Sequence, residues 1–445
     1  MPHYHIIGDI HGQAEKLECL LERLGYAPLD ASAATDSEAR EPRDCQAVFV
    51  GDLIDRGPHH RRVIEIVRGL IERGDALAVM GNHEFNALCY HTNHPSTGLP
   101  LRAHSEKNCR QHQSFLEEYP YGSEEAREVI DWFKTLPLFL ELETTAGLKR
   151  YIVDGVDEVE QEQFATQIRI VHACWDDEQI AYLKERLGEP ARIDEAFLLE
   201  ASEPQTQAFT AVETLLKGPE LPLPAGVHFF DKDGHRRERI RYKWWAGGRT
   251  YREAAIVPED QQGLIPELPL PADGPIPTYR ADAPPVFFGH YWMDGEPQTQ
   301  RHNVACLDYS AGKDGPLVAY MWFDGGSRLG AGRLRGDQFL TSDDAALFDE
   351  QAPYTFPEEL LRAASKVSAD NDVIRKSERC ACFYCFSFFP TSDLGEIDEE
   401  WVQCPVCGMD FVIGSASGLP LTRRYLAEAK RLALQPAGDS DDSTA

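Results

Sequence analysis

The chain has 445 residues, of which 42% are hydrophobic and 27% charged, and its formal net charge is −30. This length and composition are typical of a globular protein with more than one domain. The negative charge argues against general nucleic-acid binding, which requires a basic surface. No apolar run approaches a membrane span, and the start, MPHYHIIGDIHG, lacks the pattern of a signal peptide. Together with an odd number of cysteines, 11, these features predict a protein of the reducing cytoplasm.

The first third of the chain alternates strand-like and helix-like segments. Apolar runs at residues 3–9, 46–52 and 75–82 predict three strands. Between them, apolar residues at helical spacing within residues 17–24 and 63–70 predict helices. This alternation is typical of an α/β fold with parallel pairing. Ligands of such sheets bind beyond the C-terminal ends of the strands, so polar residues there are candidates for a site.

Beyond these elements, the pattern predicts more of the same fold and then a change of character. Residues 176–217 are expected to be helical, and the Pro- and Gly-rich residues 218–285 to form an irregular cap. Further strands are predicted at residues 169–175, 285–292, 303–309 and 317–324. We therefore expect a domain over residues 1–326, a linker over 327–344, a second domain over 345–435 and a disordered acidic tail over 436–445.

Polar residues gather where the predicted strands end. The motifs GDIHG, GDLIDRG and GNHE follow the first three strands, and single histidines follow two later ones. Their glycines allow tight turns, so that short side chains can converge. Carboxylate, imidazole and amide oxygen together suit divalent transition ions, and one bridging carboxylate can join two ions about 3.5–4 Å apart, the arrangement used for phosphoryl transfer. The candidate residues are Asp9, His11, Asp52, Asp55, Arg56, Asn82, His83, His172 and His290.

This set of motifs resembles the phosphoprotein phosphatase family of metallophosphoesterases, which includes serine/threonine protein phosphatases and symmetrical diadenosine tetraphosphate hydrolases. The resemblance covers roughly residues 3–325 and implies a two-sheet sandwich flanked by helices. It implies two active-site metal ions, manganese first, with iron or zinc as alternatives. Asp9 and His11 would bind one ion, and Asp52 would bridge both. The remaining ligands of the other ion would be Asn82, His172 and His290.

The same resemblance implies roles for the neighbouring polar residues. His83, held by Asp55, would protonate the leaving oxygen, and Arg56 would clamp the phosphate. A second phosphate-binding arginine is expected in the middle region, where Arg249 is a guess because no motif marks it. The fourth motif departs from the family, since its protein phosphatases carry His-Gly where this chain has His172 followed by alanine.

A cysteine cluster marks the C-terminal region. Cys382 and Cys385 form one CxxC pair, and Cys404 and Cys407 form a second. This spacing is typical of a zinc ribbon, in which four thiolates hold one structural Zn²⁺, with Cys380 as an extra thiol. The surrounding segment also resembles a small family of bacterial cytoplasmic zinc-ribbon proteins without assigned function. That resemblance implies a fold and a metal but no chemistry.

Three functional hypotheses follow. The leading one is an enzyme that hydrolyses phosphate monoesters, on phosphoserine or phosphothreonine in proteins. The first alternative keeps the chemistry but takes a dinucleoside polyphosphate, whose adenine could stack on Trp244, Trp245 or Tyr251 of the cap unless these rings pack in the core. The second alternative is a non-catalytic binding scaffold. We expect a phosphorylated substrate and a protein partner at the ribbon. We expect no membrane, since no apolar run is long enough, and no nucleic acid, because residues 393–400 are acidic.

Overall fold

The chain divides into two compact units, each with its own hydrophobic core. Unit 1 comprises Met1–Gly326 with Leu340–Asp343, and unit 2 comprises Ser327–Phe339 with Asp344–Ala445. In the parts of the chain described below, no helix has the length and apolar character needed to cross a bilayer. The computed structural model describes residues 3–26, 45–145, 149–153, 156–160, 165–230, 234–271, 278–322, 334–343, 353–368, 370–394 and 402–434.

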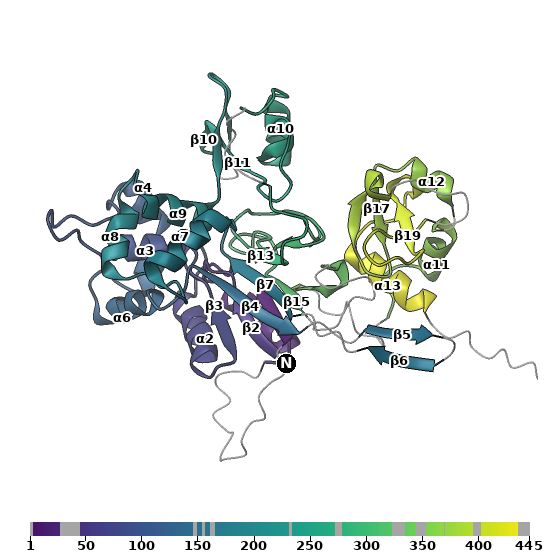
Figure 1. Cartoon of the computed structure of the whole chain (residues 1–445), viewed down its shortest axis with the longest axis horizontal. Helices are drawn as coiled ribbons and strands as arrows, with labels where there is room; N and C mark the ends of the chain where they lie inside the picture. Colours follow the sequence, from purple (N-terminus) through teal and green to yellow (C-terminus); the bar gives the residue numbers. More distant parts are fainter. Residues whose placement is uncertain are drawn as a thin grey trace, which may run out of the picture. The chain divides into compact units, whose positions relative to one another are not determined.

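Unit 1 is built on a five-stranded sheet with the order β16–β15–β1–β2–β3 (Figure 1). β1 pairs with β2 and β2 with β3 in parallel, whereas β15 runs antiparallel to β1. Consecutive residues such as Ile6 and Ile7 are fully buried, so both faces of β1 are covered, which explains its continuous apolar run. The strands span His3–Ile7 (β1), Cys45–Phe49 (β2), Ala76–Ala78 (β3), Val318–Trp322 (β15) and Phe339–Thr341 (β16).

A second sheet, with the order β14–β13–β7–β4, packs against the first. β13 is parallel to β14 and β7, and β4 is antiparallel to β7. The ring of Phe287 on β13 lies 5.0 Å from that of Tyr320 and 6.1 Å from that of Trp322 on β15, so the two sheets form a sandwich. The strands of the second sheet span Phe139–Thr145 (β4), Ala165–Val171 (β7), Val286–Phe288 (β13) and Val304–Cys306 (β14).

Helices cover the outer faces of this sandwich (Figure 1). Leu17 of α1 and Val63 of α2 share one hydrophobic core with Ile7 and Phe49 of the first sheet. Several of the helix starts carry capping side chains, for example Asp176, which accepts from two backbone amides of the first turn of α7. The helices span Ala14–Arg23 (α1), His60–Glu72 (α2), Asn82–His91 (α3), Glu106–Gln111 (α4), Gln113–Glu118 (α5), Glu124–Phe133 (α6), Asp177–Leu187 (α7), Glu195–Ser202 (α8) and Gln207–Lys217 (α9).

Residues 218–271 form the cap, which is made of short elements. It is anchored by Trp244, 1% exposed, whose indole N–H donates to the carbonyl oxygen of Ala173 at 3.0 Å. Trp245 and Tyr251 are also buried, so these rings pack in the core and do not present a surface for adenine. The short elements span Glu220–Pro222 (β8), Phe229–Phe230 (β9), Arg236–Arg237 (β10), Arg239–Tyr242 (β11), Tyr251–Ala254 (α10), Ala255–Ile256 (β12) and Glu259–Leu264 (η1), and a separate hairpin joins Lys149–Val153 (β5) to Val156–Glu160 (β6).

Unit 2 is a three-stranded antiparallel sheet with the order β18–β17–β19, accompanied by helices. Its core combines Leu361 of α11, Ile413 of β19 and Tyr425 of α13. The elements span Gly336–Gln338 (η2), Glu358–Val367 (α11), Asn371–Arg375 (α12), Arg379–Cys382 (β17), Phe388–Pro390 (β18), Thr391–Leu394 (η3), Val412–Gly414 (β19), Ser415–Ser417 (η4) and Arg423–Ala433 (α13).

The α/β sandwich expected from the sequence is confirmed, including parallel pairing of the first three strands. Of the stretch expected as a linker, 327–344, the described residues 334–343 carry the 3-10 turn η2 and the strand β16. The guanidinium of Arg423, 1% exposed, donates to the carbonyl oxygens of Gly336 and Phe339. Both hydrogen bonds join residues more than 80 positions apart, so no local sequence pattern predicts them. The predicted tail at 436–445 lies outside the described residues.

Candidate metal centre and active site

Asp52 lies at the centre of the polar cluster in unit 1. It follows β2 with a φ of +52°, and Gly81 passes so close that a Cβ there would lie 2.2 Å from the Asp52 backbone nitrogen. Oδ1 of Asp52 accepts from the backbone N–H of His83 at 3.0 Å. Oδ2 faces Nε2 of His11 at 3.7 Å and Nε2 of His172 at 3.4 Å. One carboxylate therefore stands between two groups of candidate ligands, as a bridging ligand would.

The first group of ligands is Asp9 and His11, which follow β1. Nδ1 of His11 donates to the carbonyl oxygen of Ile54 at 3.0 Å, which leaves Nε2 unprotonated in the neutral ring. Oδ2 of Asp9 accepts from the backbone N–H of His290 at 2.9 Å. Within the described residues, Oδ1 of Asp9 and Nε2 of His11 are buried without a hydrogen-bond partner. Two buried acceptors without donors fit a cation that both would coordinate.

The second group is Asn82, His172 and His290. Oδ1 of Asn82 lies 2.7 Å from Nδ1 of His290 and 3.1 Å from Nε2 of His172. Nδ1 of His172 donates to the carbonyl oxygen of Val50 at 2.9 Å, so in the neutral ring, the form that binds a metal, the electron pair of Nε2 faces oxygen atoms. A cation resolves that conflict, and ligands about 2.1 Å from one ion lie about 3 Å apart when they meet it at right angles, as in an octahedral site. The observed separations fit this spacing.

The electrostatics of the cluster also fit a positive charge. Burial and the neighbouring Asp308 raise the pKa of Asp9 well above its usual range. Against the effect of burial, the carboxylate of Asp52 raises the pKa of His172 to about 10. Both shifts arise because few positive charges surround these buried carboxylates. Divalent ions would supply that positive charge. The donor set thus fits the two ions that the sequence predicts.

His83 lies beside Asp52 and is oriented by a carboxylate. Its Nδ1 lies 2.6 Å from Oδ2 of Asp55, while Nδ1 of His112 lies 2.7 Å from Oδ1 of the same carboxylate. Burial alone would lower the pKa of His83, but the carboxylates of Asp52 and Asp55 raise it above its usual value. His83 can therefore hold a proton at the site. The sequence pattern singled out His83 and Asp55 but missed His112, which lies in a polar stretch without a motif.

Glu84 fixes the loops that carry these residues. Its buried carboxylate accepts from the backbone N–H groups of Asp52, Leu53 and Gly81, each at 2.9 Å. The turn after β2 is thereby tied to the start of α3. The role of Glu84 is to position both motifs, which the adjacent GNHE pattern alone does not reveal.

The candidate phosphate-binding arginines differ in their surroundings. Arg56, with a φ of +74°, lies with its guanidinium 4.0 Å from the ring centroid of Trp292. Arg249, the guess from the sequence, is exposed on the cap, and its backbone N–H donates to Glu253 at 2.7 Å. Arg241 on β11 instead lies at the centre, because its Nη1 donates to the carbonyl oxygen of His290 at 3.1 Å. Neither Arg241 nor Trp292 could be identified from the sequence, since no motif marks them.

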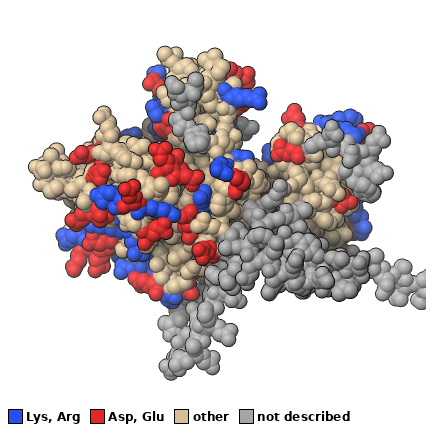
Figure 2. Space-filling view, viewed as in Figure 1, with Lys and Arg blue, Asp and Glu red and all other residues tan. Residues whose placement is uncertain are grey.

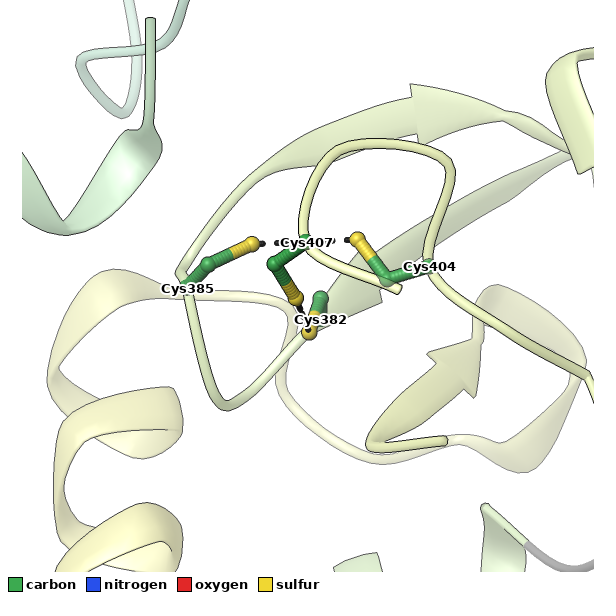
Figure 3. Close-up of side chains that lie close together, drawn as sticks. All are labelled: Cys382, Cys385, Cys404 and Cys407. Atoms are coloured by element: carbon green, nitrogen blue, oxygen red, sulfur yellow. Dashed lines mark hydrogen bonds between the residues drawn. The ribbon is translucent and has the colours of Figure 1, made fainter. Parts of the chain in front are cut away.

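In unit 2 the four predicted cysteines converge (Figure 3). Sγ of Cys382 lies 3.7 Å from that of Cys407, and Sγ of Cys385 lies 3.7 Å from that of Cys404. Four sulfurs at 2.3 Å from a tetrahedral zinc ion lie about 3.8 Å apart, so the spacing fits. Cys380 stays outside this set and lies 3.5 Å from Oγ1 of Thr391.

The front of the chain is similar to known phosphoesterases. Residues 3–196 match the calcineurin-like phosphoesterase family model. The chain is 44% identical over 81 residues to the asymmetrical bis(5'-nucleosyl)-tetraphosphatase PrpE of Bacillus mycoides, and 40% identical over 80 residues to the Bacillus subtilis protein of that name. Each match covers 18% of this chain and 30% of the relative, so the chain spans less than a third of these relatives' length.

Among solved structures, the chain is similar to a protein serine/threonine phosphatase from Saccharomyces cerevisiae, with 15% identity over 76% of this chain and 78% of that one, at a TM-score of 0.36. A cold-active protein-tyrosine phosphatase from a Shewanella species gives 14% identity over 72% of this chain and 75% of that one, at a TM-score of 0.38. The family match over 3–196 includes the three N-terminal motifs and His172, whereas His290 lies beyond it.

Proposed function

We propose that this chain, whose residues 3–196 match the calcineurin-like phosphoesterase family model, is a phosphoesterase that works with two divalent metal ions. The observation that carries the proposal is the position of Asp52, whose carboxylate stands between His11 on one side and His172 on the other. Asp9, His11 and Asp52 would hold one ion. The second ion would be held by Asp52, Asn82, His172 and His290.

The side chains around this centre fit the needs of phosphoryl transfer. When bound, two such ions polarise the phosphoryl group and activate the attacking water. His83 stands where it can protonate the leaving oxygen, because Asp52 and Asp55 favour its protonated form and Asp55 fixes its ring. Arg56 would clamp the phosphoryl oxygens with its planar fork, and we place Arg241 ahead of Arg249 as the second phosphate-binding arginine.

Two substrate classes fit this chemistry. We place dinucleoside polyphosphates first, because the relatives with 40–44% identity over 80 or 81 residues carry the name of tetraphosphatases. Phosphoserine or phosphothreonine in proteins, which the sequence motifs favoured, comes second. The buried Trp244 and Trp245 do not support the adenine stacking considered from the sequence, so the preference for nucleotides does not rest on them.

For unit 2 we propose a structural zinc ion held by Cys382, Cys385, Cys404 and Cys407. Cys382, Cys385 and Cys404 are buried and Cys407 is half-buried, and the four-sulfur ligand set is complete, which is typical of structural sites and not of catalytic ones. The backbone N–H of Val406 donates to Sγ of Cys404 at 3.4 Å, as expected for a thiolate ligand. The unit would then serve as a docking module for a protein partner.

The test is a substrate panel on chelator-treated protein with manganese, iron or zinc added back. We expect metal-dependent hydrolysis of p-nitrophenyl phosphate and of diadenosine tetraphosphate, and slower hydrolysis of a phosphoserine peptide. A variant with Asp131→Asn, an exposed carboxylate on α6, is the matched control and should behave like the wild type. Full metal loading without hydrolysis of any of the three would favour a binding scaffold and overturn the proposal.

A further inference from the structure

Two cationic side chains converge on one tryptophan ring beside the metal centre. The guanidinium carbon of Arg56 lies 4.0 Å from the centroid of the Trp292 ring, and Nζ of Lys313 lies 5.3 Å from it. The same centroid lies 5.9 Å from that of the His11 ring. We call Arg56, Trp292 and Lys313 the cation cradle. Its place next to a candidate metal ligand puts it within reach of a substrate bound at the ions.

A buried carboxylate ties together the two segments that carry Trp292 and Lys313. Oδ2 of Asp308 accepts from the backbone N–H of Trp292 at 2.7 Å, and its Oδ1 accepts from that of Ser310 at 3.0 Å. The hydroxyl of Ser310 donates to the carbonyl oxygen of Met293 at 3.1 Å. The loop after β13 and the loop after β14 are thus held as one body.

The loop that presents Lys313 is also fixed against the metal centre. Nζ of Lys16 donates to the carbonyl oxygens of Ala311, Lys313 and Gly315 at 2.9, 3.2 and 2.8 Å. At Gly312 a Cβ would lie 2.9 Å from Cδ2 of His11 and 3.0 Å from Cδ of Arg56. The loop therefore packs directly on these two residues. The backbone of this loop is thus preorganised for binding, because little of its motion remains to be lost.

The backbone at Arg56 and Trp292 of the cradle, and at Ser310 beside it, is held in unusual conformations. Arg56, Trp292 and Ser310 have φ values of +74°, +53° and +64°. Residues other than glycine rarely occupy this left-handed region and persist there only when the surrounding structure imposes it. Such residues cluster at ligand sites, so their presence in three adjoining loops points to a site for binding.

We propose that the cation cradle binds a second phosphate group of the substrate, next to the one being hydrolysed, and so selects phosphoanhydride chains such as those of dinucleoside polyphosphates. The inference rests on the proposed function, in which Arg56 clamps the reacting phosphoryl group. Lys313 then contributes a point charge for the neighbouring phosphate.

The charge of the rest of the molecule makes this local cluster necessary. The net charge of −30 repels a polyanionic substrate. Figure 2 shows acidic and basic side chains mixed over the face of unit 1 that it draws, with no extended basic surface among the described residues of that face. Attraction for a phosphate chain must therefore come from groups at the site, such as the metal ions and the cation cradle.

The test is Lys313→Gln in the full-length, metal-loaded protein, with steady-state kinetics on two substrates. We expect KM for diadenosine tetraphosphate to rise about tenfold, the scale of one hydrogen bond to a charged group, with kcat unchanged. Both constants for p-nitrophenyl phosphate, which has no second phosphate, should stay unchanged. Lys313→Arg should restore KM. Arg68→Gln, which removes an exposed charge from α2, is the control and should change neither substrate.

Each other outcome overturns the proposal. An equal rise in KM on both substrates would mean that Lys313 acts on the reacting phosphate, and no rise on either would mean that it binds nothing. A rise confined to a phosphopeptide with acidic neighbours would assign the cradle to a protein substrate.

A binding measurement separates failure of this inference from failure of the proposed function. By calorimetry, inorganic tripolyphosphate should bind the metal-loaded protein about tenfold more tightly than orthophosphate, because it reaches one more charged group. Lys313→Gln should abolish that difference, whether or not the protein hydrolyses any substrate. If the preference is absent in the wild type or persists in the variant, the cradle is not a phosphate subsite.

Discussion

The candidate metal centre of unit 1 and the cysteine cluster of unit 2 are assembled in opposite ways. The first draws its ligands from Asp9 to His290, and they follow four different strands or stand at the start of a helix. The second draws all four ligands from two CxxC turns between Cys382 and Cys407. In unit 1, therefore, the fold brings the ligands together, whereas in unit 2 the ligands lie close along the chain and a bound ion would hold the fold together.

This contrast predicts how the two regions depend on their metals. The sandwich of unit 1 has a large core of its own, which includes residues of both sheets and of the helices. Removing its ions should abolish hydrolysis and leave the fold intact. Unit 2 has two smaller clusters, and one of them is lined by Cys382, Cys385 and Cys404 themselves. Removing its ion should therefore loosen the unit.

The largest effect on hydrolysis is expected for Asp52→Asn. Loss of the bridging carboxylate should weaken the binding of both ions. Because these ions stabilise the charge of the transition state by several kcal/mol, the rate should fall by about 10³-fold or more. Metal analysis should show fewer ions in unit 1 and an unchanged zinc content in unit 2. Normal occupancy with normal turnover would show that Asp52 does not bridge.

His83→Asn should come next. As the acid for the leaving oxygen, His83 should contribute about 10²–10⁴-fold to hydrolysis of an alkyl phosphate, whose leaving group needs a proton. The loss should be smaller for p-nitrophenyl phosphate, whose leaving group needs none. Comparing the two rates measures the role directly, and equal losses would assign His83 to structure alone.

A smaller effect is expected for His112→Gln. This change removes the hydrogen bond from His112 to Asp55 and so loosens the carboxylate that orients His83. A hydrogen bond to a charged group contributes about 1.5–3 kcal/mol, so a loss of about tenfold in rate is expected on the alkyl phosphate. The same variant should lose less on p-nitrophenyl phosphate. His94→Gln, at a half-buried site paired with Glu203, is the control.

Cys404→Ser should have the smallest effect on hydrolysis and the largest effect on the stability of unit 2. The variant should release one zinc ion and expose unit 2 to proteolysis, because a structural zinc contributes about 10–16 kcal/mol of binding free energy to the folded state. Hydrolysis of p-nitrophenyl phosphate should stay at the wild-type rate. Cys380→Ser should keep the zinc, since Cys380 lies outside the four-sulfur set. A loss of small-substrate activity in folded, metal-loaded unit 1 would contradict the independence of the two units.

Local patterns in the sequence were enough to predict the α/β fold class and to select most of the polar residues that meet at the centre. Glycine-flanked motifs such as GDIHG and GNHE carry that information within four or five residues, because a tight turn and its ligand are neighbours in the chain. The two CxxC pairs are local in the same sense. His172 and His290 required the further inference that later strands end at the same edge, and the structure places them within hydrogen-bond distance of Asn82.

What only the tertiary structure decided is the set of residues that hold these groups in place. His112, Trp292 and Arg241 carry no motif, and each contacts a residue 49 or more positions away. The cation cradle is formed because Asp308 and Lys16 fix two loops against His11 and Arg56, and this arrangement depends on the packing of both sheets. Sequence spacing determines which side chains share a turn, whereas distances between turns depend on how the whole core packs.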